Sequence, residues 1–133
     1  MATFHLQIVT PDRMIYDGEV EKIIVRTVGG DVCILARHID YVAPLGIGEA
    51  RVTDAEGKTR IAACSGGMLG VANGEARVMA TTFEWAEDIN LARAQHAREE
   101  AQRKLDIVDH HDQNYAVLEA KLKRALARIS VKG

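Results

Sequence analysis

The chain has 133 residues, a formal net charge of -2 at pH 7 and a charged fraction of 27%. This length allows one ordinary domain, or a β-domain of about eighty residues with a helical appendage, and we expect two small units. The lack of a basic excess argues against nucleic acid as a partner. No apolar run approaches the roughly twenty residues that span a bilayer, so we expect no direct membrane insertion.

The two cysteines indicate a reducing environment. Cys33 and Cys64 both lie inside apolar, strand-like runs, and the N-terminus lacks the charged, apolar and small-residue order of a secretion signal. These features favour the cytoplasm, with two buried and unpaired thiols rather than a disulfide.

Residues 1–84 show short alternations of apolar and polar residues, punctuated by glycine. We expect strands at 3–10, 14–16, 20–27, 32–35, 41–45, 50–53, 59–64, 68–71 and 76–79. Asp17-Gly18 predicts a turn, Asn73-Gly74 predicts a tight hairpin, and Gly66-Gly67 predicts a β-bulge or a close backbone approach. So many short strands predict an antiparallel β-sandwich or flattened barrel.

The pattern changes from residue 85 onwards, where glycine is absent until the last residue and good helix formers dominate. Asp88 is placed to cap a helix that begins at Ile89. Apolar residues at helical spacing form one face of this helix: Ala94, Ala97, Ala101, Leu105 and Val108. A second helix is expected to start near Asp112 or Asn114. Its apolar face is formed by Tyr115, Leu118, Leu122, Leu126 and Ile129. The faces predict an antiparallel two-helix hairpin over residues 85–133, which is too small to be stable alone.

The sequence contains no convincing catalytic or metal-binding constellation. Gly46-Ile47-Gly48 lacks the third glycine and the helix of a dinucleotide-binding loop, so we interpret it as a turn. Ser65 lacks the strand-to-helix turn of a nucleophile elbow, and no base or carboxylate is placed to activate His38. Residues 110–112, His-His-Asp, have no third ligand at a useful spacing. We therefore predict no catalytic residues and no metal site.

The last helix carries a cluster of positive charges: Lys121, Lys123, Arg124, Arg128 and Lys132. Cations near a helix C-terminus suit the helix dipole, which is one explanation for the cluster. Arg124 and Arg128 lie one turn apart, where like charges repel by roughly 0.2–0.5 kcal/mol, and two guanidiniums at that spacing fit a phosphate or an acidic surface. The residues by themselves leave both explanations open.

Several motifs in order carry a resemblance to one family: Val9-Thr10-Pro11-Asp12-Arg13 with Tyr16 and Gly18, Gly30-Asp31, Ile34-Leu35, His38, Leu45 with Gly48, residues 63–69 with Val71, residues 84–89, and residues 124–131. Together they resemble the epsilon subunit of bacterial F-type ATP synthases over essentially the full length. The chain departs from that pattern at Arg37, where glycine is usual, and at residues 39–41, which replace a small-Pro-apolar run.

The resemblance implies a non-catalytic rotor subunit. It implies a β-sandwich over residues 1–84 that lies beside the gamma subunit and contacts the ring of c-subunits, at the cytoplasmic side of the bacterial plasma membrane. It also implies a hairpin over residues 85–133 that lies folded on the sandwich, or extends and obstructs ATP hydrolysis by the catalytic alpha/beta head. The tail that would meet the head is Lys121, Lys123, Arg124 and Arg128.

In some members of that family the folded hairpin binds ATP as a regulatory ligand, and no cofactor is obligatory. The positions that match the binding motif are Glu84, Ile89, Asn90, Arg93, Ala94, Arg124 and Arg128. Asn90 replaces an aspartate, so a hydrogen bond from adenine would lose its charge assistance and we expect ATP binding to weaken several-fold without being lost. Three alternatives stay open: a stalk subunit with a purely structural coupling role, an enzyme that uses His38 or Ser65, and an adaptor whose hairpin holds an unrelated partner.

Overall fold

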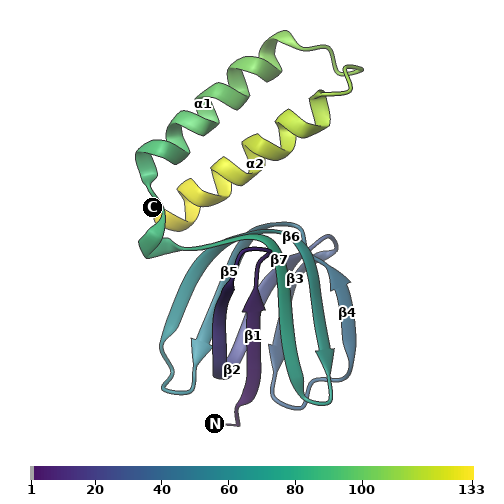
Figure 1. Cartoon of the computed structure of the whole chain (residues 1–133), viewed down its shortest axis with the longest axis vertical. Helices are drawn as coiled ribbons and strands as arrows, with labels where there is room; N and C mark the ends of the chain where they lie inside the picture. The colour runs from purple at the N-terminus through teal and green to yellow at the C-terminus, as the bar shows by residue number, and fades with distance from the viewer. Residues whose placement is uncertain (1) are drawn as a thin grey trace.

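The computed structural model describes residues 2–133 as a β-domain followed by a helical hairpin (Figure 1). The strands are β1 (Phe4–Val9), β2 (Met14–Thr27), β3 (Gly30–Leu35), β4 (Tyr41–Pro44), β5 (Ile47–Asp54), β6 (Thr59–Ala72) and β7 (Glu75–Trp85). A short 3-10 helix, η1 (Ala86–Asp88), leads to α1 (Leu91–Ile107) and α2 (Tyr115–Lys132). The predicted fold class, a β-sandwich or flattened barrel followed by a two-helix hairpin, is confirmed. The predicted division between residues 84 and 85 stays a prediction.

The strands close into a flattened barrel because β1 pairs with β7 on one side and with β2 on the other. The order is β1-β7-β6-β5-β2-β3, and β4 adds to β6. The long strand β2 serves both layers, pairing with β1 near its start and with β3 and β5 further on. The sheet is not purely antiparallel as predicted, because β1 and β7 run parallel from Leu6↔Ala76 to Val9↔Met79. No short turn joins these two strands, so nothing local imposes an antiparallel pairing.

The barrel interior is filled by aliphatic side chains that are almost fully buried: Leu6, Ile8, Val20, Ile23, Val25, Ile34, Val52, Leu69 and Val78. Each such side chain contributes about 1.5–3 kcal/mol relative to an exposed one, so this layer is the main stabilising feature of the domain. The aromatic rings of Tyr16 and Phe83 contact Trp85 edge-to-face, with centroids 6.2 Å and 5.0 Å away. They fix the end of β7, where the chain leaves the barrel.

The predicted hairpin at Asn73-Gly74 is confirmed. Of the two structures predicted for Gly66-Gly67, the close backbone approach is found and the bulge is not. Asn73 and Gly74 have φ values of 52° and 76° and join β6 to β7. The β6–β7 register is the same on both sides of Gly66, with Ser65↔Thr82 before it and Gly67↔Ala80 after it, so no extra residue is inserted into either strand. A Cβ on Gly67 would lie 1.8 Å from the carbonyl oxygen of Met79, so only glycine fits there.

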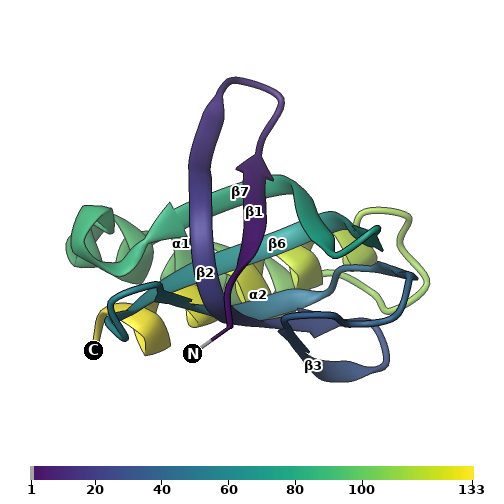
Figure 2. The same ribbon diagram turned by 90° about the horizontal axis from the view of Figure 1, so that it is seen from below.

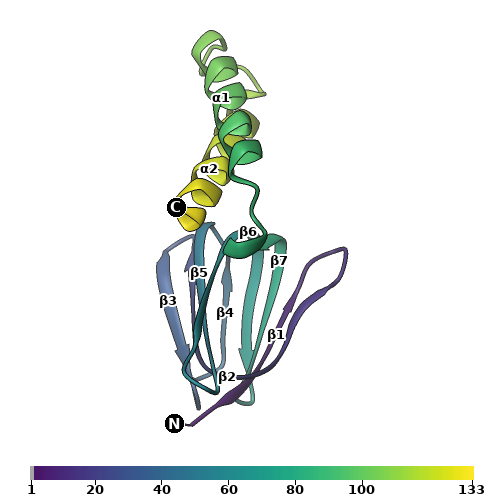
Figure 3. The same cartoon turned by 90° about the vertical axis from the view of Figure 1, so that its left-hand side faces the viewer.

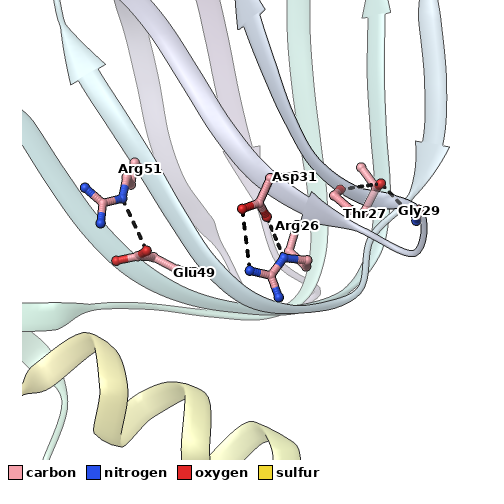
Figure 4. A network of polar contacts seen from close by, with 7 residues as sticks. Arg26, Thr27, Gly29, Asp31, Glu49 and Arg51 are labelled. Carbon is pink, nitrogen blue, oxygen red and sulfur yellow. Dashed lines mark hydrogen bonds and ion pairs between the residues drawn. The ribbon is translucent and has the colours of Figure 1, made fainter.

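Two other glycine segments do not form the turns that were predicted. Asp17 and Gly18 continue β2, because both residues pair with β1. Ile47 and Gly48 begin β5 instead of turning, and a Cβ on Gly48 would lie 2.9 Å from the Cβ of Arg26. Arg26 itself is held across the β2–β3 pair by Asp31, as Figure 4 shows. The glycine at position 48 therefore makes room for a side chain of the neighbouring strand.

The cysteines differ in exposure. Cys64 is buried in β6, as predicted, and burial raises the pKa of its thiol to about 12. Cys33 is exposed, contrary to the prediction, because β3 lies at the edge of the sheet and alternate residues of the strand face outward.

The two helices pack antiparallel, and the end of α2 holds the hairpin against the barrel (Figures 1 and 3). α2 contacts β5, β6 and η1, whereas α1 packs chiefly on α2. Ala94, Ala101 and Ala125 are buried, but Ala97 is exposed and Leu126 remains 44% exposed, so the predicted helix faces are only partly correct. Within residues 2–133, no helix has the length and apolar character needed to cross a bilayer.

Candidate functional site

A cleft of about 410 Å³ opens where β7, the start of α1 and the end of α2 meet. Its lining residues are Arg13, Thr82, Phe83, Glu84, Asp88, Asn90, Arg93, Ala94, Ala97 and Arg128. A second pocket of about 390 Å³ adjoins it and shares Arg13, Phe83, Glu84 and Asp88 with it. Pockets for small molecules usually enclose roughly 300–1,000 Å³, so the cleft has the size of a ligand site.

The cleft brings together five of the seven residues that the sequence predicted for ATP: Glu84, Asn90, Arg93, Ala94 and Arg128. They meet because the antiparallel hairpin returns the end of α2 to the start of α1. The other two lie elsewhere. Ile89 is 4% exposed and belongs to the buried interior, and Arg124 lines a cavity of about 10 Å³ beside the cleft.

Asn90 caps α1, because its side-chain oxygen accepts a hydrogen bond of 3.0 Å from the backbone N–H of Arg93. The prediction that Asp88 is the cap is wrong. Asp88 belongs to η1, and the chain is extended at Ile89, with φ -74° and ψ 128°, before α1 begins. Capping engages the amide oxygen of Asn90, so the outward polar group of this side chain is its NH2, a hydrogen-bond donor. An aspartate would present a second acceptor in its place.

An ion pair joins the end of α2 to β7 at the cleft. The Arg128 Nε lies 3.1 Å from the Glu84 Oε1, and the two side chains are 29% and 39% exposed. At that exposure a pair contributes only about 0.2–1 kcal/mol. The pair therefore stabilises the folded position of the hairpin only weakly.

The charges around the cleft favour an anion. Arg13, Arg93 and Arg128 supply three guanidiniums, against the carboxylates of Glu84 and Asp88. Within the part of the chain that the structure describes, neither Arg13 nor Arg93 forms an ion pair. Guanidinium groups bind phosphate oxygens through paired N–H donors, so the cleft suits a phosphorylated ligand.

The turn that carries Asp88 is fixed by a neighbouring contact. Arg60 donates two hydrogen bonds to Glu87, and its guanidinium lies 3.8 Å from the centre of the Trp85 ring. The hydrogen bond from Arg60 holds the pKa of the Glu87 carboxyl below its usual value. This contact fixes η1, and with it Asp88 of the cleft lining, to the end of the barrel.

The four cations of the predicted inhibitory tail divide into two pairs. Arg124 and Arg128 are half-buried and line a cavity with residues of β5 and β6. Lys121 and Lys123 are exposed, and the Lys123 Nζ lies 3.9 Å from the Glu119 carboxylate. The folded hairpin thus covers two of the four charges.

Among residues 2–133, the other candidates from the sequence, Ser65 and His38, do not take part in a catalytic or metal-binding group. Ser65 is buried in the middle of β6, and His38 bonds through its Nδ1 to the carbonyl of Ile39. Among residues 2–133, no group of three or more His, Cys, Asp or Glu is placed to hold a metal ion.

The sequence prediction missed five residues of the cleft: Arg13, Thr82, Phe83, Asp88 and Ala97. Arg13 had one usable signal, since it ends the Thr-Pro-Asp-Arg segment after the first strand. That segment was part of the family resemblance, but it did not indicate which helices Arg13 would face.

Comparison with known proteins identifies the family. Residues 3–86 match the family model "ATP synthase, Delta/Epsilon chain, beta-sandwich domain", and residues 87–133 match "ATP synthase, Delta/Epsilon chain, long alpha-helix domain". The chain is 38% identical to the ATP synthase epsilon chain of Caldicellulosiruptor bescii, with 98% of this chain and 94% of that protein covered. It is 37% identical to the epsilon chain of Halalkalibacterium halodurans, with 100% and 99% covered.

Solved structures agree. A chain of the Euglena gracilis mitochondrial ATP synthase, OSCP/F1/c-ring, superposes with a TM-score of 0.83 and 26% identity, covering 96% of this chain and 79% of that one. A chain of the Tetrahymena thermophila mitochondrial ATP synthase central stalk/c-ring shares the fold alone, with a TM-score of 0.65 and 13% identity. Because the two family models together span residues 3–133, the chain belongs to the ATP synthase delta/epsilon chain family.

Proposed function

We propose that this chain is the epsilon subunit of the central stalk of a bacterial F-type ATP synthase, with no catalytic residues of its own. In this role it couples the gamma subunit to the ring of c-subunits, as a peripheral component on the cytoplasmic side of the plasma membrane. The support is the match to bacterial epsilon chains over nearly the whole length.

The barrel carries an exposed apolar surface suited to a stalk partner. Val42, Met68 and Met79 are 69%, 37% and 44% exposed on the neighbouring strands β4, β6 and β7. Met68 pairs directly with Met79 in the sheet, so these side chains form one continuous surface. Contiguous apolar surface usually marks a protein–protein interface, and gamma is the partner that we propose for it. Mixing the chain with purified gamma tests this: a Met68→Lys, Met79→Lys variant should lose the complex, and unchanged binding would contradict the assignment.

The hairpin is the regulatory part of this proposal, and ATP bound in the cleft stabilises its folded form. One observation carries the argument: the cleft is lined by Glu84 before the hairpin, by Asn90 and Arg93 at its start, and by Arg128 at its end. A single ligand can touch all of them only while the hairpin is folded. Bound ATP then adds RT ln(1 + [ATP]/Kd), about 1.4 kcal/mol at ten times the Kd. The hairpin is held mainly by the end of α2, so this contribution is large enough to shift its balance.

The extended hairpin is the inhibitory form. Extension exposes Arg124 and Arg128 together with Lys121 and Lys123, and this cluster meets acidic surface on the catalytic head. Replacing all four by Ala should raise ATP hydrolysis by the assembled enzyme, and added salt should reproduce part of the increase by screening the same charges. Unchanged hydrolysis in both experiments would contradict the electrostatic basis of inhibition.

Calorimetric titration of the chain with ATP tests the nucleotide site. The wild type should bind at millimolar ATP or below, and Arg128→Ala should bind about ten-fold more weakly because it removes a charge-assisted contact. Lys121→Ala, an exposed cation on the same helix, is the matched control and should change nothing. If neither the wild type nor Asn90→Asp binds ATP, the hairpin does not sense nucleotide and the purely structural coupling role is the correct one.

A further inference from the structure

The loop between β1 and β2 carries Arg13, which lines the cleft. It projects from the barrel at the end where the helices attach (Figures 2 and 3). Arg13 lines both the cleft and the adjoining pocket. The barrel therefore presents a cation to the same space as Arg93 of α1 and Arg128 of α2.

The backbone of this loop is held by hydrogen bonds, while the Arg13 side chain pairs with no other described residue. The carbonyl of Arg13 accepts hydrogen bonds from the N–H of Thr10 at 3.0 Å and from its hydroxyl at 3.4 Å. The Arg13 side chain is exposed and forms no hydrogen bond or ion pair within residues 2–133. A guanidinium that lines the same cleft as two others is suited to bind an anion, because its N–H donors are available and the loop backbone that carries it is already ordered.

We propose that Arg13 is a third arginine of the site and binds the phosphate groups of a nucleotide held between the β1–β2 loop and the hairpin. This inference rests on the proposed nucleotide site and extends it. The ligand then links the barrel to both helices, because Arg13 belongs to the barrel whereas Arg93 and Arg128 belong to the hairpin. Binding at Arg13 contributes directly to holding the hairpin on the barrel.

Calorimetric titrations of the full chain with ATP, AMP and adenosine test the role of Arg13. Arg13→Ala should weaken ATP binding about ten-fold, weaken AMP binding less, and leave adenosine binding unchanged, because only the phosphates lose a charge-assisted contact. Arg13→Lys should recover part of the loss, since lysine keeps the charge but lacks the planar fork. Lys58→Ala removes one positive charge from the turn between β5 and β6, away from the cleft lining, and should bind ATP as the wild type does.

The outcomes separate this inference from the one on which it rests. If the wild type binds ATP and Arg13→Ala binds it equally well, Arg13 has no role and the nucleotide site stands. An equal loss for adenosine and ATP would mean that Arg13 maintains the loop rather than binding phosphate, which also overturns the proposal. If the wild type binds no ATP at millimolar concentration, the nucleotide site itself is wrong and the role of Arg13 is lost with it.

Discussion

Replacing Asn90 by aspartate should tighten ATP binding without disturbing α1. The Asn90 side-chain oxygen accepts the 3.0 Å hydrogen bond from the Arg93 N–H, and this leaves the NH2 group facing outward. The 6-amino group of adenine is also a donor, so two donors oppose each other unless the amide turns over. Turning it over gives up the cap, which contributes about 1 kcal/mol. The single amide oxygen of asparagine can therefore accept a hydrogen bond from the Arg93 N–H or from the adenine amino group, but not from both at once.

Aspartate removes that conflict, because one carboxylate oxygen caps α1 and the other accepts from the base. The recovered cap and the charge-assisted bond together amount to about 1–2 kcal/mol, or about 5- to 30-fold tighter ATP binding. The negative charge also suits the helix N-terminus, so stability should be unchanged or slightly higher. Guanine has a carbonyl where adenine has the amino group, so the wild type should prefer ATP over GTP less strongly than Asn90→Asp does.

Titration calorimetry with ATP and GTP measures both effects, and urea unfolding reports on the cap. Asn90→Ser is the matched control, because serine caps a helix as well as asparagine does but offers no second polar group. The serine variant should unfold as the wild type does and bind ATP more weakly than Asn90→Asp. If the aspartate and serine variants bind ATP equally, residue 90 does not contact the base and the reasoning fails.

Three further predictions test the docked hairpin, the close backbone approach at Gly67 and the thiols. Ala127→Leu should detach the hairpin, because the cavity beside Ala127 has a volume of only about 10 Å³ and overpacking costs about 1–3 kcal/mol. Hydrogen exchange in α2 should then become faster. Ala116→Leu, at an exposed position of the same helix, should leave the exchange unchanged. Gly67→Ala should lower the free energy of unfolding by about 3 kcal/mol or more, since φ is +99° and the Cβ meets the Met79 carbonyl, whereas Gly70→Ala, with nothing within 4 Å, should cost under about 1 kcal/mol in the same urea titration. A thiol reagent at pH 8 should modify Cys33 and spare Cys64, whose pKa is raised by burial to about 12 from 9.0. The stability due to the neutral Cys64 thiol is complete below pH 9 and is lost as the pH rises toward 12, so Cys64→Ala should lose less stability than the wild type over that range. Reaction of both thiols in the native chain would contradict the burial of Cys64.

The sequence by itself determined the fold class and the order of the elements. A two-residue period before residue 85 and a helical period after it follow from local backbone geometry, which neighbouring residues impose without help from distant ones. The same holds for the hairpin at Asn73-Gly74, since both residues adopt a positive φ there. The motif match supplied Glu84, Asn90, Arg93, Ala94 and Arg128, and the structure brings these five residues to one cleft.

The tertiary structure alone decided features that depend on residues far apart in the chain. Whether Cys33 faces solvent depends on which strand covers its side of the sheet, and the choice of Asn90 over Asp88 as the cap depends on where the chain leaves the barrel. Arg13 joins the cleft only because the loop between β1 and β2 lies at the end of the barrel where the helices attach. Local propensity acts over a few residues, whereas these placements arise from packing the barrel and the hairpin against each other, so no short stretch of sequence contains them.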